Sequence, residues 1–150
     1  MRSITLQEAN KIIELSIEKA SKENLKPLAI IVLDAGGRVK AFQKQDGAAL
    51  MRFEIAYGKA FAALAMGRSS KLVLQKYWEK PKFMENLEAL SDGPIFLEGG
   101  AQLILDEFGE TVGAVGITGD TNEMDDEAAF AGIKGAGFYV DTNQYKGDDK

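Results

Sequence analysis

The chain has 150 residues, 45% of them hydrophobic and 27% charged, which is enough for one globular domain with a single core. It contains no cysteine and no histidine, so disulfides, zinc–thiolate sites, iron–sulfur clusters and Ser-His-Asp catalysis are excluded. The net charge of −5 argues against nucleic-acid binding. Residues 1–6 do not resemble a signal peptide and no apolar run could span a membrane, so we expect a cytoplasmic protein.

The first predicted element is a helix. Thr5 and Glu8 form an S/T-x-x-E capping box, the usual signature of a helix start. Apolar residues then recur at helical spacing as far as Ala20. We expect this helix to end near Asn24, ahead of Pro27.

Two β-hairpins are predicted on either side of a helical middle. Residues 28–33 and 39–44 flank the turn 34–37, and residues 101–105 and 111–117 flank a turn near Gly109. Between the hairpins we expect a helix over about 49–66, ending at Gly67, and another starting at Ser69 or Ser70. A last short helical turn should open at Pro81, with Phe83, Met84, Leu87 and Leu90 at helical spacing.

The chain should end in a helix that starts near Asn122 and runs to Gly132 or Gly135, followed by a loose tail over about 141–150. Its acidic residues between 120 and 127 are explained by the favourable interaction of negative charge with a helix N-terminus. The element order favours a single α/β (α+β) domain over residues 1–150, with an antiparallel sheet.

Five motifs in collinear order resemble the GlcG/HbpS family over about residues 4–135. They are Leu33-Asp34-Ala35-Gly36-Gly37-Arg38, Phe42 with Asp46-Gly47, Gly58-Lys59-Ala60 with Gly67-Arg68-Ser69-Ser70, Glu98-Gly99-Gly100, and Val115-Gly116-Ile117-Thr118-Gly119 with the acidic run 123–127 and Ala131-Gly132.

The resemblance implies a profilin-like fold with about five antiparallel strands flanked by helices. It also implies a homo-oligomer and a haem-associated or catabolic-operon role. A similar module ends the PduO-type corrinoid adenosyltransferases. Some haem-binding relatives use a histidine on the first helix, and this chain has none. Haem would therefore need Tyr, Met or Lys, or a pocket without an iron ligand, and Tyr57 is the best oxygen ligand.

Three side chains are candidates for acid–base chemistry: Lys59, Glu98 and Asp34. Ligand or cofactor contacts are expected from Tyr57, Phe42, Gly36, Gly37, Gly99 and Gly100, and no metal site is expected. Each has a structural alternative. The glycines can simply close turns, the aromatic residues can be core, and the lysine can lie on the surface and pair with Glu54 or Glu79.

Three functions remain open from the sequence. The first is a small-ligand-binding protein, with haem as one ligand and the site formed where the glycine turns meet the lysine-bearing helix. The second is a small enzyme (a lyase, isomerase or hydrolase) that acts on a small organic acid by Lys, Glu or Asp proton transfer. The third is a regulatory or accessory subunit of a catabolic pathway.

Overall fold

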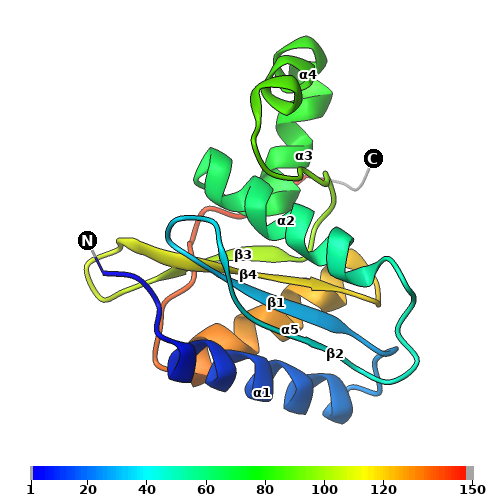
Figure 1. Cartoon of the computed structure of the whole chain (residues 1–150), viewed down its shortest axis with the longest axis vertical. Coiled ribbons are helices and arrows are strands. Elements are labelled where there is room, and N and C mark those ends of the chain that lie inside the picture. The colour runs from blue at the N-terminus through cyan, green and yellow to red at the C-terminus, as the bar shows by residue number, and fades with distance from the viewer. Residues whose placement is uncertain (1, 148–150) are drawn as a thin grey trace.

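A four-stranded antiparallel sheet with the strand order β2-β1-β4-β3 organises the computed structural model, which describes residues 2–147 (Figure 1). The elements are α1 (Leu6–Lys22), β1 (Ala29–Asp34), β2 (Val39–Lys44), α2 (Arg52–Met66), α3 (Ser70–Glu79), α4 (Pro81–Leu90), β3 (Ala101–Leu105), β4 (Thr111–Thr118) and α5 (Asn122–Gly135).

The two predicted hairpins are confirmed, and the antiparallel pairing of β1 with β4 joins them. In that central pair Ala29 lies opposite Thr118 and Asp34 lies opposite Gly113. The expected number of about five strands is corrected to four. In the described residues, Tyr139 forms an isolated bridge with Leu105. No neighbouring residue pair extends this bridge into a fifth strand.

Helices cover both faces of the sheet. In Figure 1, α1 and α5 lie on one face, α2 lies on the other, and α3 and α4 project beyond α2. Close packing depends on small residues. A Cβ at Gly132 of α5 would lie 2.3 Å from Ser16 Oγ of α1, and one at Gly116 of β4 would lie 2.4 Å from Ala56 O of α2. Substituting either glycine would force the layers apart.

The predicted helix ends agree with the structure to within a few residues. The capping box is present, since Glu8 N donates to Thr5 Oγ1 at 3.2 Å and Thr5 N donates to Glu8 Oε1 at 3.0 Å. Gly67 ends α2 in the left-handed region, with φ +67°. The helical spacing expected from Pro81 to Leu90 corresponds to α4, which is a full ten-residue helix rather than a short turn.

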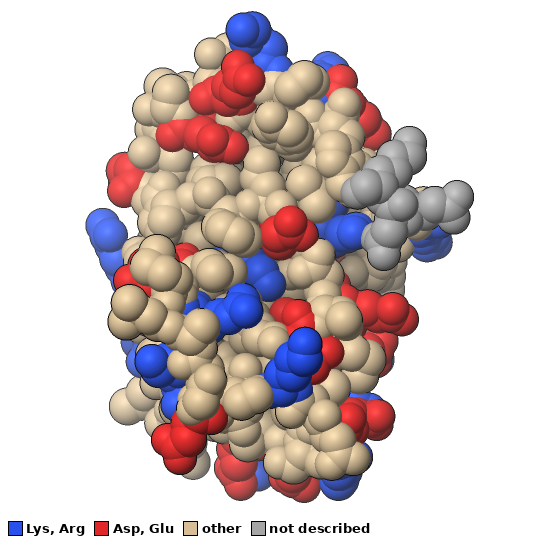
Figure 2. Space-filling model, turned by 90° about the vertical axis from the view of Figure 1, so that its right-hand side faces the viewer, with Lys and Arg blue, Asp and Glu red and all other residues tan. Residues whose placement is uncertain are grey.

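The surface carries mixed charge on the face shown in Figure 2, where acidic and basic side chains are interspersed. Within residues 2–147 no helix has the length and apolar character needed to cross a membrane.

Candidate functional site

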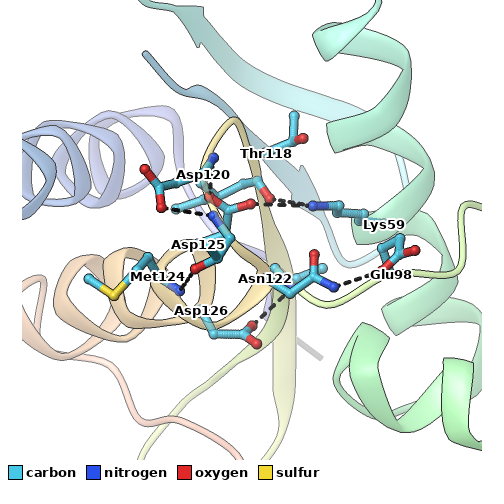
Figure 3. Close-up of polar contacts among 12 residues, drawn as sticks. Lys59, Glu98, Thr118, Asp120, Asn122, Met124, Asp125 and Asp126 are labelled. Carbon is cyan, nitrogen blue, oxygen red and sulfur yellow. Dashed lines mark hydrogen bonds and ion pairs between the residues drawn. The ribbon is translucent and has the colours of Figure 1, made fainter. Parts of the chain in front are cut away.

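Lys59 lies beneath the start of α5. Its side chain is buried, with only 2% of the residue exposed. The ammonium donates to Ile117 O of β4 at 3.0 Å and lies 3.5 Å from Asp125 Oδ2. Figure 3 shows the Lys59 side chain pointing toward Asp125. Asp125 is also fully buried, and its Oδ1 accepts a bond from Asp120 N at 3.0 Å. The ion pair therefore connects α2, β4 and the first turn of α5, and it replaces the surface pairing with Glu54 or Glu79 considered from the sequence.

Burial governs the protonation of this ion pair. Loss of water lowers the pKa of Lys59, although the negative charge of Asp125 acts in the opposite direction. Burial likewise raises the pKa of Asp125 against the effect of Lys59. Each charge thus depends on its partner for stability in the core.

The Gly99-Gly100 turn lies directly over Lys59. Gly100 has φ +119°, and a Cβ there would lie 2.4 Å from Ile117 O and 2.9 Å from Lys59 Nζ. Gly100 N donates to Asp126 Oδ1 at 3.1 Å. The turn therefore requires glycine at position 100, and it binds a carboxylate from a helix 26 residues further along the chain.

Asp126 accepts two hydrogen bonds through the same oxygen. The second comes from Gln102 Nε2 at 2.8 Å, and Gln102 is itself fully buried. Burial raises the pKa of Asp126 to about 6, although both hydrogen bonds and the nearby Lys59 lower it. Both bonds fall on Oδ1, and no residue between 2 and 147 donates a hydrogen bond to Oδ2, which can therefore accept one from a ligand.

Glu98 lies beside the start of α5, next to this turn. Its Oε2 accepts a bond from Asn122 Nδ2 at 2.7 Å, and Figure 3 shows the two side chains facing each other. Asn122 is the first residue of α5, so this contact and the one from Gly100 to Asp126 both fix that helix against the turn.

A recess of about 510 Å³ opens between α3, α5 and the segment 141–147. Its lining combines carboxylates, amides, one lysine and two rings: Lys71, Asn122, Glu123, Asp126, Glu127, Phe130, Gln144, Tyr145 and Gly147. Tyr145 packs edge-on against Trp78 of α3, with 6.1 Å between ring centroids. Residues 148–150 of the expected loose tail lie outside the described residues.

The first hairpin turn lies elsewhere. Asp34 is the last residue of β1, and Ala29 is the first. Gly100 bonds to Ile117, which pairs with Ile30, so Gly100 lies near the first end of β1 and far from Asp34. Asp34 Oδ1 accepts bonds from Gly36 N at 2.9 Å and Arg38 N at 3.1 Å. The structure brings together Lys59, Glu98, Gly99 and Gly100, and it leaves Asp34, Gly36 and Gly37 at the far end of the sheet.

Tyr57 and Phe42 belong to an aromatic row between β2 and α2. Phe42 meets Phe53 edge-on at 4.9 Å between centroids, and Tyr57 lies 5.9 Å from Phe53 and 6.2 Å from Phe61. This row packs against the core on the α2 face of the sheet. Neither residue lines the recess.

Sequence reasoning missed the residues that surround Lys59 and the recess, above all Asp125, Asp126 and Gln102. A signal was available for Asp125. It precedes Ala128, Ala129 and Gly132 by three, four and seven residues, and that spacing places it on the buried face of α5. Within the described residues no group of three or more His, Cys, Asp or Glu side chains could hold a metal ion.

Comparison with solved structures shows the same fold in several proteins. A crystal structure of a PduOC–haem complex is 24% identical, with a TM-score of 0.78 over 95% of this chain and 99% of the other. The Klebsiella pneumoniae protein ORFY is 23% identical, with a TM-score of 0.80 over 91% and 92% of the two chains. HbpS is 22% identical, with a TM-score of 0.79 over 91% and 92%.

The sequence comparisons agree with the structural ones. An uncharacterised 15.0 kDa protein of Citrobacter freundii, from the dhaT–dhaS intergenic region, is 27% identical over 123 residues, which are 82% of this chain and 84% of that protein. The model of the family described as "Haem degrading protein HbpS-like" matches residues 4–134. The chain therefore belongs to the HbpS-like family.

Proposed function

We propose that this chain binds a small molecule in the recess between α3, α5 and the segment 141–147. The observation that carries the proposal is Asp126, a partly buried carboxyl on the wall of the recess. Gly100 and Gln102 hold one of its oxygens, and the other is free to accept a bond. A concave site with a few fixed polar groups and aromatic walls is the usual form of a small-ligand site.

The lining indicates what kind of ligand fits. Phe130 and Tyr145 offer ring surface, while Asp126 offers a carboxylate acceptor and Asn122 an amide oxygen. A flat molecule with a polar group at one edge satisfies both kinds of contact. Lys59 cannot touch such a ligand, because it is 2% exposed and lies under the Gly100 turn.

Trp78 provides a direct test. It is the only tryptophan in the chain and packs against Tyr145 at the edge of the recess, so its fluorescence should respond to an occupied site. We expect at least one class among small aromatic carboxamides, carboxylates and amines to give a saturable change. Asp126→Ala should weaken that binding by about tenfold, the effect of losing one hydrogen bond to a charged group.

The matched control is Glu85→Gln on α4, which removes an exposed carboxyl outside the recess and should leave the affinity unchanged. Absence of binding by all three classes, or equal affinities in wild type and Asp126→Ala, would overturn the proposal.

Haem is the second candidate ligand, because the family description names haem degradation and one relative was solved with haem. The recess does not fit it. Glu123, Asp126 and Glu127 would oppose the propionates, Lys71 alone would attract them, and the chain has no histidine or cysteine to bind the iron. Tyr57, the oxygen ligand preferred from the sequence, packs in the aromatic row away from the recess, and Tyr145 on the recess wall already packs against Trp78.

A haemin titration separates the two candidates. Our proposal expects no sharp Soret shift that depends on a tyrosine. A saturable shift that is lost in Tyr57→Phe would instead assign haem to the aromatic row and contradict the recess as the principal ligand site.

An enzymatic role for the same recess is supported by the protonation of Asp126. A carboxyl with a pKa of about 6 exchanges its proton near neutral pH, as a general acid or base must. Among the acid–base residues expected from the sequence, Glu98 accepts a bond from Asn122, which lines the recess. Turnover of a bound ligand that is lost in Asp126→Asn would support this role.

The expected homo-oligomer and cytoplasmic location remain proposals. Exposed apolar side chains support self-association: Leu50 is 86% exposed, Leu90 83%, Met51 56% and Phe83 49%. Light scattering of the purified chain at several concentrations would test it, and a monomer at all of them would contradict it.

A further inference from the structure

The recess already holds a carboxamide group, and it belongs to the chain itself. Gln144 Nε2 donates to Gln102 Oε1 at 2.9 Å, and Gln102 Nε2 lies 3.3 Å from Gln144 Oε1. The two side-chain amides thus form a reciprocal pair. Gln144 lines the recess from the segment 141–147, while Gln102 of β3 is fully buried behind it.

The orientation of Gln102 follows from its other neighbour. Asp126 Oδ1 accepts from Gln102 Nε2 at 2.8 Å, and an ionised carboxylate can only accept, so the amide nitrogen must face it. The oxygen of Gln102 therefore faces Gln144. If Gln144 moved away without replacement, a fully buried carbonyl oxygen would lose its donor, which is unfavourable.

The partner of Gln102 must supply a donor and an acceptor side by side. A primary carboxamide does this, because its N–H meets the Gln102 oxygen while its C=O meets the Gln102 nitrogen. A carboxylate has no donor and would bring a second negative charge beside Asp126. An amine has no acceptor and would leave the Gln102 nitrogen with Asp126 alone.

We propose that the recess recognises a planar aromatic carboxamide, and that the Gln144 side chain is an internal substitute that the ligand displaces from Gln102. This inference rests on the proposed function and gives its ligand a chemical class. The aromatic part of the ligand lies against Phe130 and Tyr145, which line the same recess.

The segment that carries Gln144 belongs to no helix or strand. It follows α5, and Gln144 is also held by its bond to Asp141 O at 2.7 Å. An internal group of this kind competes with the ligand and lowers its apparent affinity, since binding requires the fraction of molecules in which the site is open. Removing the Gln144 amide should therefore strengthen binding.

The experiment is a titration of the full chain with benzamide, followed by Trp78 fluorescence. We expect Gln144→Ala to bind benzamide about tenfold more tightly than wild type, because the competing group is gone. Benzoate, which has nearly the same shape, should bind at least about tenfold more weakly than benzamide, because it lacks the donor. The Gln102 side-chain NH₂ signals in an NMR spectrum should shift on adding benzamide to Gln144→Ala.

The matched control is Asn143→Ala, which truncates an exposed amide one residue earlier and should leave the affinity at the wild-type value. Equal benzamide affinities in wild type and Gln144→Ala, or equal affinities for benzamide and benzoate, would overturn the inference. If benzamide fails while another class still binds in an Asp126-dependent manner, the inference falls and the proposed function stands. If no class binds, both fall.

Discussion

The two glycine turns of this chain look alike in sequence and differ in what closes them. In the Gly36-Gly37 turn, Asp34 Oδ1 accepts from Gly36 N and Arg38 N, so a residue of the same turn binds the backbone. In the Gly99-Gly100 turn, the acceptor is Asp126 Oδ1, from a helix 26 residues away.

The difference separates a local turn from a site. A turn closed by its own aspartate is complete without the rest of the protein, as an Asx-turn is. A turn that binds a distant carboxylate, and lies over a buried ion pair, fixes several elements relative to one another. We therefore expect substitutions at the second turn to have larger effects, and the predictions below test that contrast.

The largest effect should come from the buried cation under the second turn. Lys59→Met leaves Asp125 buried without its counter-charge, which should lower the free energy of unfolding by about 3–5 kcal/mol. Urea denaturation measures the loss. The double variant Lys59→Met/Asp125→Asn should be less destabilised than the sum of the single changes, because it leaves no unpaired charge.

An exposed ion pair supplies the control for this prediction. Lys82 lies 3.7 Å from Glu85 on the surface of α4, and Lys82→Met should change stability by less than about 0.5 kcal/mol. Equal losses at Lys59 and Lys82 would contradict the view that burial makes the first pair important.

The second largest loss of stability is expected at Gly100, and Gly36 in the other turn is its control. Gly100→Ala puts a Cβ 2.4 Å from Ile117 O at φ +119°, and this should cost about 2–4 kcal/mol. At Gly36 the nearest atom to a Cβ is Asp34 Oδ1 at 3.4 Å, so Gly36→Ala should change stability by no more than about 0.5 kcal/mol. Thermal unfolding of both variants would reveal the contrast, and similar melting temperatures would refute it.

The sequence predicted what short-range chemistry determines. The capping box of Thr5 and Glu8, the left-handed end of α2 at Gly67 and both hairpins depend on residues a few positions apart. It also grouped Lys59 with both glycine turns, whereas the structure places only the Gly99-Gly100 turn beside this lysine. The resemblance also gave about five strands, one more than the structure has.

The partners of those residues could not be predicted from local patterns. Whether Gly36 or Gly100 lies near Lys59 depends on the pairing of β1 with β4, which joins residues as far apart in the sequence as Ala29 and Thr118. The acidic run at the start of α5 satisfies the macrodipole whichever carboxylate is buried, so composition alone did not identify Asp125 or Asp126. Gln102 and Gln144 belong to no motif, and only the fold brings them together.

The smallest effect concerns Asp126 and pH. Its pKa in the folded chain is about 6, above its ordinary value of 3.8, so folding favours the protonated form. The resulting stabilisation is fully present below pH 3.8 and is lost as the pH rises through about 6.

Asp126→Asn keeps an oxygen for Gly100 and Gln102 but has no proton to lose. Between pH 4 and 7 its stability should therefore fall by about 1–3 kcal/mol less than that of wild type. Lys59, Asp125 and Glu98 are the same in both proteins, so the difference between the two stability curves reports Asp126. Parallel curves from urea denaturation over this range would show that the second turn does not hold Asp126 in the environment described above.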